Sequence, residues 1–124
     1  MIDRVYLVTA ASEPPFMVSQ GLANFMVKLI ILFPRPSDEA SFETHYNQNL
    51  ALMEQLPGIR RRQACMVLGN PAGNSPYYRI LELYFDDYTE LDKALTSPEG
   101  RAAGADLMHF SRTAELIFAE VFEE

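Results

Sequence analysis

The sequence predicts an α+β fold in which four antiparallel strands form one sheet and the helices cover one of its faces. Four short runs of apolar and β-branched residues have the length and composition that are typical of strands. Polar caps and helical spacing predict helical segments between them. The resulting order, strand–helix–strand–strand–helix–strand, is that of a split β-α-β arrangement.

The composition is that of a single globular domain. The chain has 124 residues, of which 48% are hydrophobic and 22% charged. Its net charge of −7 disfavours nucleic acid and anionic membranes as partners, because both require a basic surface. No apolar run reaches the roughly 18 residues needed to span a membrane. The single cysteine, Cys65, precludes an intrachain disulfide and favours the cytoplasm, and we expect it to be a small core residue.

The chain divides at residue 26. Residues 1–25 hold a short apolar run, a Pro-Pro loop and no clear period, so we interpret them as an N-terminal extension without chemistry. Residues 26–124 form the predicted domain, which begins with the strand Val27–Phe33. Pro34 and Pro36 end this strand because neither can donate to a ladder.

The first helix is predicted between Ser37, which can cap it, and the Pro57-Gly58 turn, which ends it. Spacing of three and four residues predicts one inward stripe, formed by Phe42, His45, Tyr46, Asn49, Met53 and Leu56. His45 and Asn49 are polar members of this stripe, and a buried polar group is costly without a partner. Either these two side chains are satisfied structurally, or they line a cavity.

The next two strands are predicted at Ile59–Leu68 and Tyr77–Phe85, as an antiparallel hairpin with a turn-rich loop. The three arginines at 60–62 are either a solvated edge or include one that pairs with an acid or a ligand carboxylate. Alternation places Tyr78, Ile80, Glu82 and Tyr84 on one face. Glu82 is a candidate acid or base if burial raises its pKa, and a cross-strand salt bridge to a neighbouring arginine is the alternative.

The remaining elements are two short helices and a last strand. Asp87 begins the first helix as part of an Asp-x-x-Glu capping box, and Ser97 caps the second, predicted over Pro98–His109. The last strand is Ala114–Phe122, with large apolar residues on both faces. This order is the ferredoxin-like plan. The uncovered face of the sheet is rich in apolar side chains, so we expect a homodimer in which two sheets form a dimeric α+β barrel.

From Met26 to Val121 the chain resembles the ethyl tert-butyl ether degradation (EthD) family of the dimeric α+β barrel superfamily. The resemblance rests on the stretches MVKLIILFPRP, FETHYNQNLALMEQLPGIRR, YYRILELYFDD and LTSPEGRAAGADLMHF, in this order. It implies a homodimer with a pocket between each subunit's sheet and helices. It also implies xenobiotic degradation, the breakdown of ethers, aromatics or other small hydrophobic compounds, often classed as oxidoreductase activity.

One position departs from the family pattern. Members often carry His-x-Pro-Leu before the Pro-Gly turn, whereas this chain has Asn49 at the position of the histidine. A neutral amide cannot take up a proton near pH 7, so His45, one turn earlier, is the candidate replacement. Asp106, in AGADLMHF, matches a family position and is the best acidic candidate.

Two functional hypotheses follow. In the first, the protein is a cofactor-independent oxidoreductase, or an isomerase or lyase of the same superfamily, with His45 as base and Asp106 or Glu82 assisting. Asn49 orients the substrate or stabilises an oxyanion, while Tyr46 and Tyr84 shape the pocket. In the second, it is a non-catalytic binding or accessory protein, which the substitution at Asn49 favours.

Cofactors receive little support from the sequence. Haem bound through His45 or His109 is a weaker third hypothesis, because no haem motif is visible. Two histidines and one distant cysteine do not have the spacing of a zinc site. We therefore expect neither a cofactor nor a metal.

Overall fold

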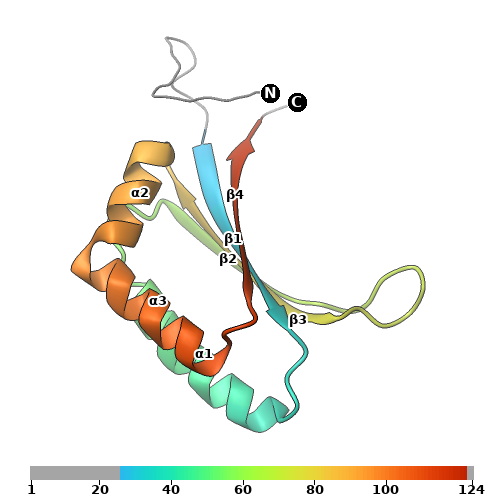
Figure 1. The fold of residues 1–124 in the computed structure, drawn as a ribbon. Helices are drawn as coiled ribbons and strands as arrows, with labels where there is room; N and C mark the ends of the chain where they lie inside the picture. Colours follow the sequence, from blue (N-terminus) through green and yellow to red (C-terminus); the bar gives the residue numbers. More distant parts are fainter. Residues whose placement is uncertain (1–25, 123–124) are drawn as a thin grey trace.

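The computed structural model describes residues 26–122, which form one sheet with helices on one side (Figure 1). The predicted extension, residues 1–25, lies outside this range. The elements are β1 (Met26–Pro34), α1 (Glu39–Met53), β2 (Arg61–Met66), β3 (Tyr77–Phe85), α2 (Tyr88–Thr96), α3 (Pro98–Phe110) and β4 (Glu115–Val121). All four predicted strands and the predicted helices are present.

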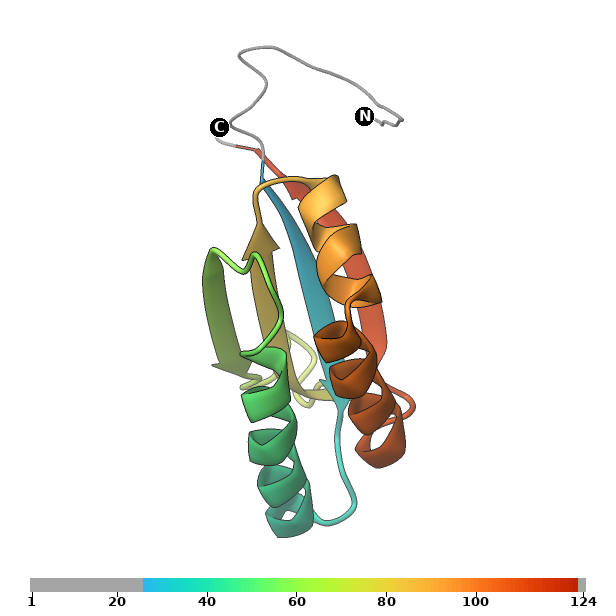
Figure 2. The same ribbon diagram turned by 90° about the vertical axis from the view of Figure 1, so that its left-hand side faces the viewer.

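The sheet has the strand order β2-β3-β1-β4, and every neighbouring pair is antiparallel. The central strand β1 pairs with β3 on one side and β4 on the other. All three helices lie on the same side of the sheet in Figure 1, and in Figure 2 they stand in front of it. This arrangement confirms the predicted α+β, ferredoxin-like fold.

The core lies between the central strands and the helices. Alternate residues of β1 are buried on the helix side: Val27, Leu29, Ile31 and Phe33. The predicted stripe is buried at Phe42, Tyr46, Asn49 and Met53 of α1 and at Leu56, which follows the helix. His45 is exposed, so its placement in this stripe was wrong. An α-helix turns about 100° per residue, which puts residue 45 at the margin of a stripe centred on Asn49 and Met53.

The outer strand β2 differs from the prediction. All six of its residues are exposed, because β2 is an edge strand and its two faces are left uncovered within residues 26–122. Cys65 is therefore an exposed thiol rather than the expected core residue. Alternation alone could not reveal this, since the position of a strand in the sheet depends on its pairing.

The ends of α1 also differ from the prediction. Asp38, not Ser37, is the N-cap: its backbone is extended and its Oδ1 accepts a hydrogen bond of 3.1 Å from the backbone N–H of Ser41. The helix ends at Met53, several residues before the Pro57-Gly58 turn. The caps of α2 and α3 are as predicted: the side chains of Asp87 and Ser97 accept hydrogen bonds from backbone N–H groups three residues later.

A register shift between Phe33 and Pro34 interrupts the alternation of β3. Such an irregularity places an extra residue in one strand and turns neighbouring side chains to the same face. Tyr78 consequently contacts Phe42 of α1, with ring centroids 5.4 Å apart, although alternation predicted the opposite face. Tyr78 and Arg79 therefore both reach α1.

Candidate functional site

Asn49 of α1 is a buried link between two helices. Its side chain is 1% exposed, and its Nδ2 donates to the backbone oxygen of Ala103 at 3.0 Å and to Oδ2 of Asp106 at 2.9 Å. Both acceptors belong to α3. Asn49 and Asp106 thus lie together, as a partnered pair that holds α1 against α3.

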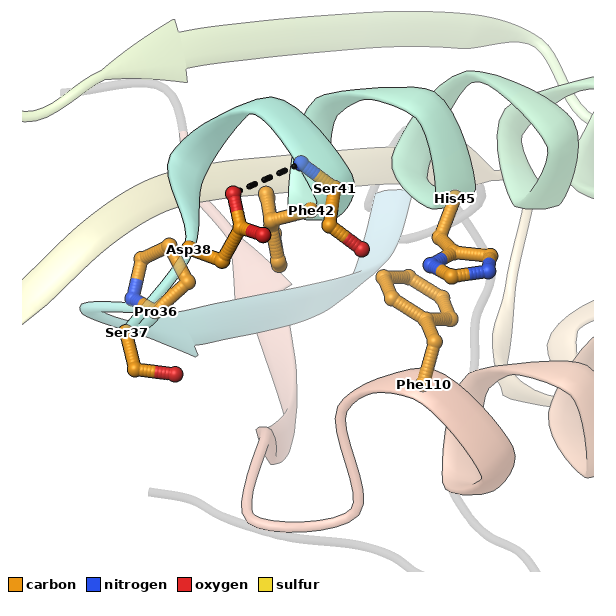
Figure 3. Close-up of a pocket in the computed structure, with 7 residues that line it drawn as sticks. All are labelled: Pro36, Ser37, Asp38, Ser41, Phe42, His45 and Phe110. Carbon is orange, nitrogen blue, oxygen red and sulfur yellow. Dashed lines mark hydrogen bonds between the residues drawn. The ribbon is translucent and has the colours of Figure 1, made fainter.

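His45 lies one turn before Asn49 and borders an open hollow of about 240 Å³ (Figure 3). The hollow is lined by residues from the β1–α1 connection, the start of α1 and the end of α3: Pro36, Ser37, Asp38, Ser41, Phe42, His45 and Phe110. The ring of His45 lies over that of Phe110, with centroids 6.2 Å apart. We call this the α1–α3 hollow. It combines two aromatic rings with one imidazole and one carboxylate.

Glu82 and Tyr84 occupy the opposite face of the sheet, away from the helices. Glu82 Oε2 is 3.4 Å from the ammonium of Lys28, and Glu82 Oε1 is 3.2 Å from the Tyr84 hydroxyl. A cross-strand ion pair, the predicted alternative for Glu82, is therefore present, but its partner is Lys28 of β1 and not the expected arginine. The Arg61 guanidinium lies over the Tyr84 ring at 4.9 Å.

The other two arginines at the start of β2 pair with acids. Arg60 forms a bidentate bond with Asp86, with distances of 3.1 and 2.9 Å. Arg62 pairs with Glu54 at the end of α1. Both pairs are exposed, so each contributes little to stability. Their carboxylate partners come from this chain rather than from a ligand.

Tyr46 lies in a third place, between α1 and β3. The Arg79 guanidinium covers its ring, with Cζ 4.2 Å from the centroid. Arg79 also forms a bidentate pair with Glu43, at 3.0 and 2.7 Å, and this pairing lowers the pKa of the Glu43 carboxyl. Burial raises the pKa of the Tyr46 phenol, and the charge of Arg79 acts in the opposite direction.

The structure therefore distributes the six predicted site residues over three places. Asn49 and Asp106 form one pair with His45 one turn away, Glu82 and Tyr84 form another, and Tyr46 belongs to a third group. No hydrogen bond or ion pair joins these groups in the described part of the chain. Within residues 26–122, no three His, Cys, Asp or Glu side chains are grouped so that they could hold a metal ion.

Glu43, Arg79 and Phe110 were not among the predicted site residues. Phe110 ends α3, and only the packing of α3 beside α1 brings it to His45. Glu43 and Arg79 are 36 residues apart. A charged residue at an inward position of β3 was the one available signal for Arg79.

Comparison with known proteins places the chain in a family. The sequence profile of the EthD domain matches residues 35–114, which is more than half of the chain. The chain belongs to the EthD family. A relative from Rhodococcus erythropolis, an uncharacterized 11.0 kDa protein in the thcB-thcC intergenic region, is 36% identical over 90 residues. That alignment covers 69% of this chain and 84% of the relative.

One solved structure agrees with this assignment, and a second shares the fold. An ethyl tert-butyl ether degradation (EthD) family protein from Bacillus halodurans C-125 superposes with a TM-score of 0.76 at 36% identity, over 78% of this chain and 99% of its own. A dimeric protein of unknown function with a ferredoxin-like fold, from Bacteroides fragilis, superposes with a TM-score of 0.56 at 24% identity. The superposition covers 77% of the chain described here and 96% of the Bacteroides fragilis protein.

Two enzymes share the fold at 12% identity. They are the hydroxynitrile lyase of Passiflora edulis, with a TM-score of 0.66 and coverage of 80% and 95%, and SnoaB, a cofactor-independent oxygenase from Streptomyces nogalater. SnoaB superposes with a TM-score of 0.54 and coverage of 82% and 94%. At this identity the likeness concerns the fold alone. No helix in residues 26–122 of the EthD-family protein is long and apolar enough to cross a bilayer.

Proposed function

We propose that this EthD-family protein binds a small, mostly hydrophobic compound, such as an ether or an aromatic, in the α1–α3 hollow during the breakdown of such compounds. The observation that carries the proposal is the position of His45. His45 is the predicted base, and its side chain lines the hollow beside the ring of Phe110. At about 240 Å³ the hollow is slightly smaller than the roughly 300 Å³ at which common ligand pockets begin, so it suits a small compound.

The chemistry proposed for this site is proton abstraction by His45 without a cofactor. Neutral imidazole accepts a proton near pH 7, and the Phe42 and Phe110 rings offer an apolar surface on which a substrate can lie. Loss of a substrate proton is the first step that cofactor-independent oxidation, isomerisation and elimination have in common. The activity that we propose is an oxidoreductase of this kind, in which His45 takes the proton of an acidic O–H or C–H bond, such as that of a phenol, and dissolved dioxygen accepts the electrons.

A non-catalytic binding or accessory role is the second candidate, and one observation favours it. Both N–H bonds of the Asn49 amide are already used, by Ala103 and Asp106 of α3. The N–H groups of Asn49 therefore bind the protein itself, which favours a structural role at the position of the family's histidine. In this role the hollow would hold a compound for another enzyme, in the cytoplasm that the single exposed cysteine favours.

We also propose that the protein is a homodimer that joins through the open face of the sheet. This face carries apolar side chains from three strands: Ile30, Leu32, Ile80, Ile117 and Ala119. Ile117 is 43% exposed. An apolar sheet face of this kind is typical of a surface that another subunit covers, and structural neighbours are described as dimeric.

Binding to the hollow can be tested by titrating the full chain with ethyl tert-butyl ether and toluene while recording amide and methyl NMR spectra. We expect shifts at Ser41, His45 and Phe110. Ser41→Trp should fill the hollow and abolish them, whereas Gln48→Trp, at an exposed position of the same helix, should leave them unchanged. Shifts that persist in Ser41→Trp, or their absence in the wild type, would contradict binding in the hollow.

Catalysis is tested separately from binding. Oxygen uptake and product formation should be followed for any compound that binds, with the purified protein and no added cofactor. Turnover that His45→Gln abolishes supports the enzyme, whereas binding without turnover supports the accessory role.

A further inference from the structure

One oxygen of the Asp38 carboxylate, at the edge of the α1–α3 hollow, has no protein partner. Asp38 caps α1 through Oδ1, which accepts the hydrogen bond of 3.1 Å from the backbone N–H of Ser41. Within residues 26–122, its other oxygen, Oδ2, accepts no hydrogen bond and forms no ion pair. Asp38 lines the hollow and is exposed, so a ligand in the hollow can reach Oδ2 (Figure 3).

Asp38 and His45 are the polar groups at the two ends of the hollow. They are two helical turns apart in the sequence, so they lie on nearly the same face of α1, about 10 Å apart along the helix axis. In Figure 3, Ser41 and Phe42 lie between them. A ligand along this face of α1 can therefore meet the carboxylate at one end and the imidazole at the other.

The middle of the hollow is aromatic. The rings of Phe42 and Phe110 line it, and their centroids are 5.7 Å apart. A flat aromatic ligand can pack against these rings. A benzene ring with polar groups at opposite positions, together with a hydrogen bond of about 2.8 Å at each end, spans about the distance between the Asp38 and His45 positions. The hollow therefore suits a para-substituted ring better than a branched compound.

The charges near Asp38 favour a ligand that donates a hydrogen bond at this end. An ionised carboxylate can only accept. Glu39, in the first turn of α1, adds a second acid, and no lysine or arginine is among the described residues that line the hollow. Arg35, a nearby cation in the sequence, donates its Nε to the backbone oxygen of Ser75 at 3.1 Å. An anionic group would meet two carboxylates here, whereas a hydroxyl or ammonium group can bind Oδ2.

We propose that Asp38 is a specificity-determining residue of the hollow, and that the preferred ligand is a para-substituted phenol whose second substituent donates a hydrogen bond to Asp38 Oδ2. This inference rests on the proposed function, because it assigns a ligand class to the same site. The phenolic O–H meets His45, the proposed base, and the ring lies on Phe42 and Phe110. Asp38 thereby distinguishes a phenol with a second donor from one of similar shape without it.

The test uses the full chain at pH 7 and two probes of similar shape. The first is 4-hydroxybenzyl alcohol, which has the second donor. The other is 4-(methoxymethyl)phenol, in which a methyl group replaces the hydrogen of the alcohol. NMR shifts at Ser41, His45 and Phe110 follow binding in the hollow. We expect the alcohol to bind about tenfold more tightly than the methyl ether, because only the alcohol donates to the carboxylate.

Two variants remove one negative charge each. Asp38→Asn keeps the cap of α1, because an asparagine oxygen caps a helix as well as an aspartate oxygen, so its Tm should remain close to that of the wild type. We expect about tenfold weaker binding of the alcohol by this variant, but not of the methyl ether. Glu39→Gln removes the charge of the next residue, which does not line the hollow, so alcohol binding should change less than about twofold.

Three outcomes would overturn the role of Asp38. The first is equal affinity of the wild type for the two probes, or binding of neither. The second is unchanged alcohol affinity in Asp38→Asn. The third is an equal loss in Asp38→Asn and Glu39→Gln, which would indicate a general effect of charge rather than a hydrogen bond to Asp38. The hollow itself is decided separately, by titration with ethyl tert-butyl ether and toluene, because neither compound has a hydrogen-bond donor.

Discussion

The side-chain amide of Asn49 donates a hydrogen bond of 2.9 Å to the carboxylate of Asp106, and this bond joins the middle of α1 to α3. A second bond from the same nitrogen reaches the backbone oxygen of Ala103 at 3.0 Å. One buried amide thus satisfies a main-chain carbonyl and a partly buried acid. Asn49 thereby holds the middle of α1 against α3.

Replacement of Asn49 should destabilise the fold. Asn49→Leu removes the donor of the Asp106 carboxylate and the second hydrogen bond of the Ala103 carbonyl, so we expect a loss of about 1–3 kcal/mol in the free energy of unfolding. Asn47→Leu, an exposed position on the same helix, should change stability by less than about 0.5 kcal/mol. Urea unfolding measures both. Equal stability of Asn49→Leu and the wild type would contradict a structural role for the amide.

His45 should matter for function and not for stability. Its side chain is exposed, so His45→Ala should alter the free energy of unfolding by less than about 0.5 kcal/mol. If His45 is the base, turnover of a bound compound should fall by about 100-fold or more. His109→Ala, the other exposed histidine, is the control and should retain the wild-type rate. A similar loss of turnover in both variants would argue against His45.

The Glu43–Arg79 pair should make stability depend on pH in the acidic range. Pairing lowers the pKa of Glu43 from its ordinary value of 4.5 in the folded protein. The stabilising contribution is therefore fully present above about pH 4.5 and is lost as pH falls through the lowered pKa. Glu43→Gln should be less stable than the wild type at pH 7, and the difference should shrink on acidification.

Thermal unfolding of both proteins between pH 7 and pH 3 measures this difference. Asp92→Asn, an exposed acid of α2, is the control, and its difference from the wild type should remain nearly constant. If the difference in Tm between Glu43→Gln and the wild type grew as the pH fell, it would contradict a stabilising Glu43–Arg79 pair.

The two glycines of α3 should respond to alanine in opposite ways. A Cβ at Gly100 would lie 2.1 Å from the backbone oxygen of Ala94 and 2.7 Å from that of Leu95, so the α2–α3 junction would have to shift. We expect Gly100→Ala to cost about 1–3 kcal/mol. A Cβ at Gly104 meets no atom within 4 Å among the described residues, so Gly104→Ala should gain about 0.5–1 kcal/mol through helix propensity. Chemical unfolding distinguishes the two.

The proposed dimer can be tested with two adjacent residues of β4. Ile117 lies on the open face of the sheet and Leu116 on the helix side, and they are almost equally exposed, at 43% and 44%. Ile117→Glu should weaken self-association at least tenfold, because it places a charge in the proposed interface. Leu116→Glu should leave it unchanged. Sedimentation equilibrium gives both dissociation constants, and a monomeric wild type or equal effects would refute this interface.

Local patterns in the sequence determined the fold. The β-rich runs, the prolines at the end of β1, and the caps at Asp87 and Ser97 each act within a few residues, so their outcome could be predicted without a structure. Their order then restricted the topology to a split β-α-β sheet, and the stretches shared with the EthD family agreed with it. Predictions that needed finer geometry were wrong. The cap of α1, for example, was predicted to be Ser37 and is Asp38.

Tertiary structure alone decided which candidate residues meet. The sequence identified Asn49 as an anomaly but could not reveal that its partners, Ala103 and Asp106, are 54 and 57 residues away. Cys65 is exposed because β2 became an edge strand, and Glu82 lies away from the helices because of the pairing of β3 with β1. Strand order and helix packing depend on contacts between residues that are distant in the sequence. The periodicity of a segment indicates only the direction in which a side chain points from its own helix or strand.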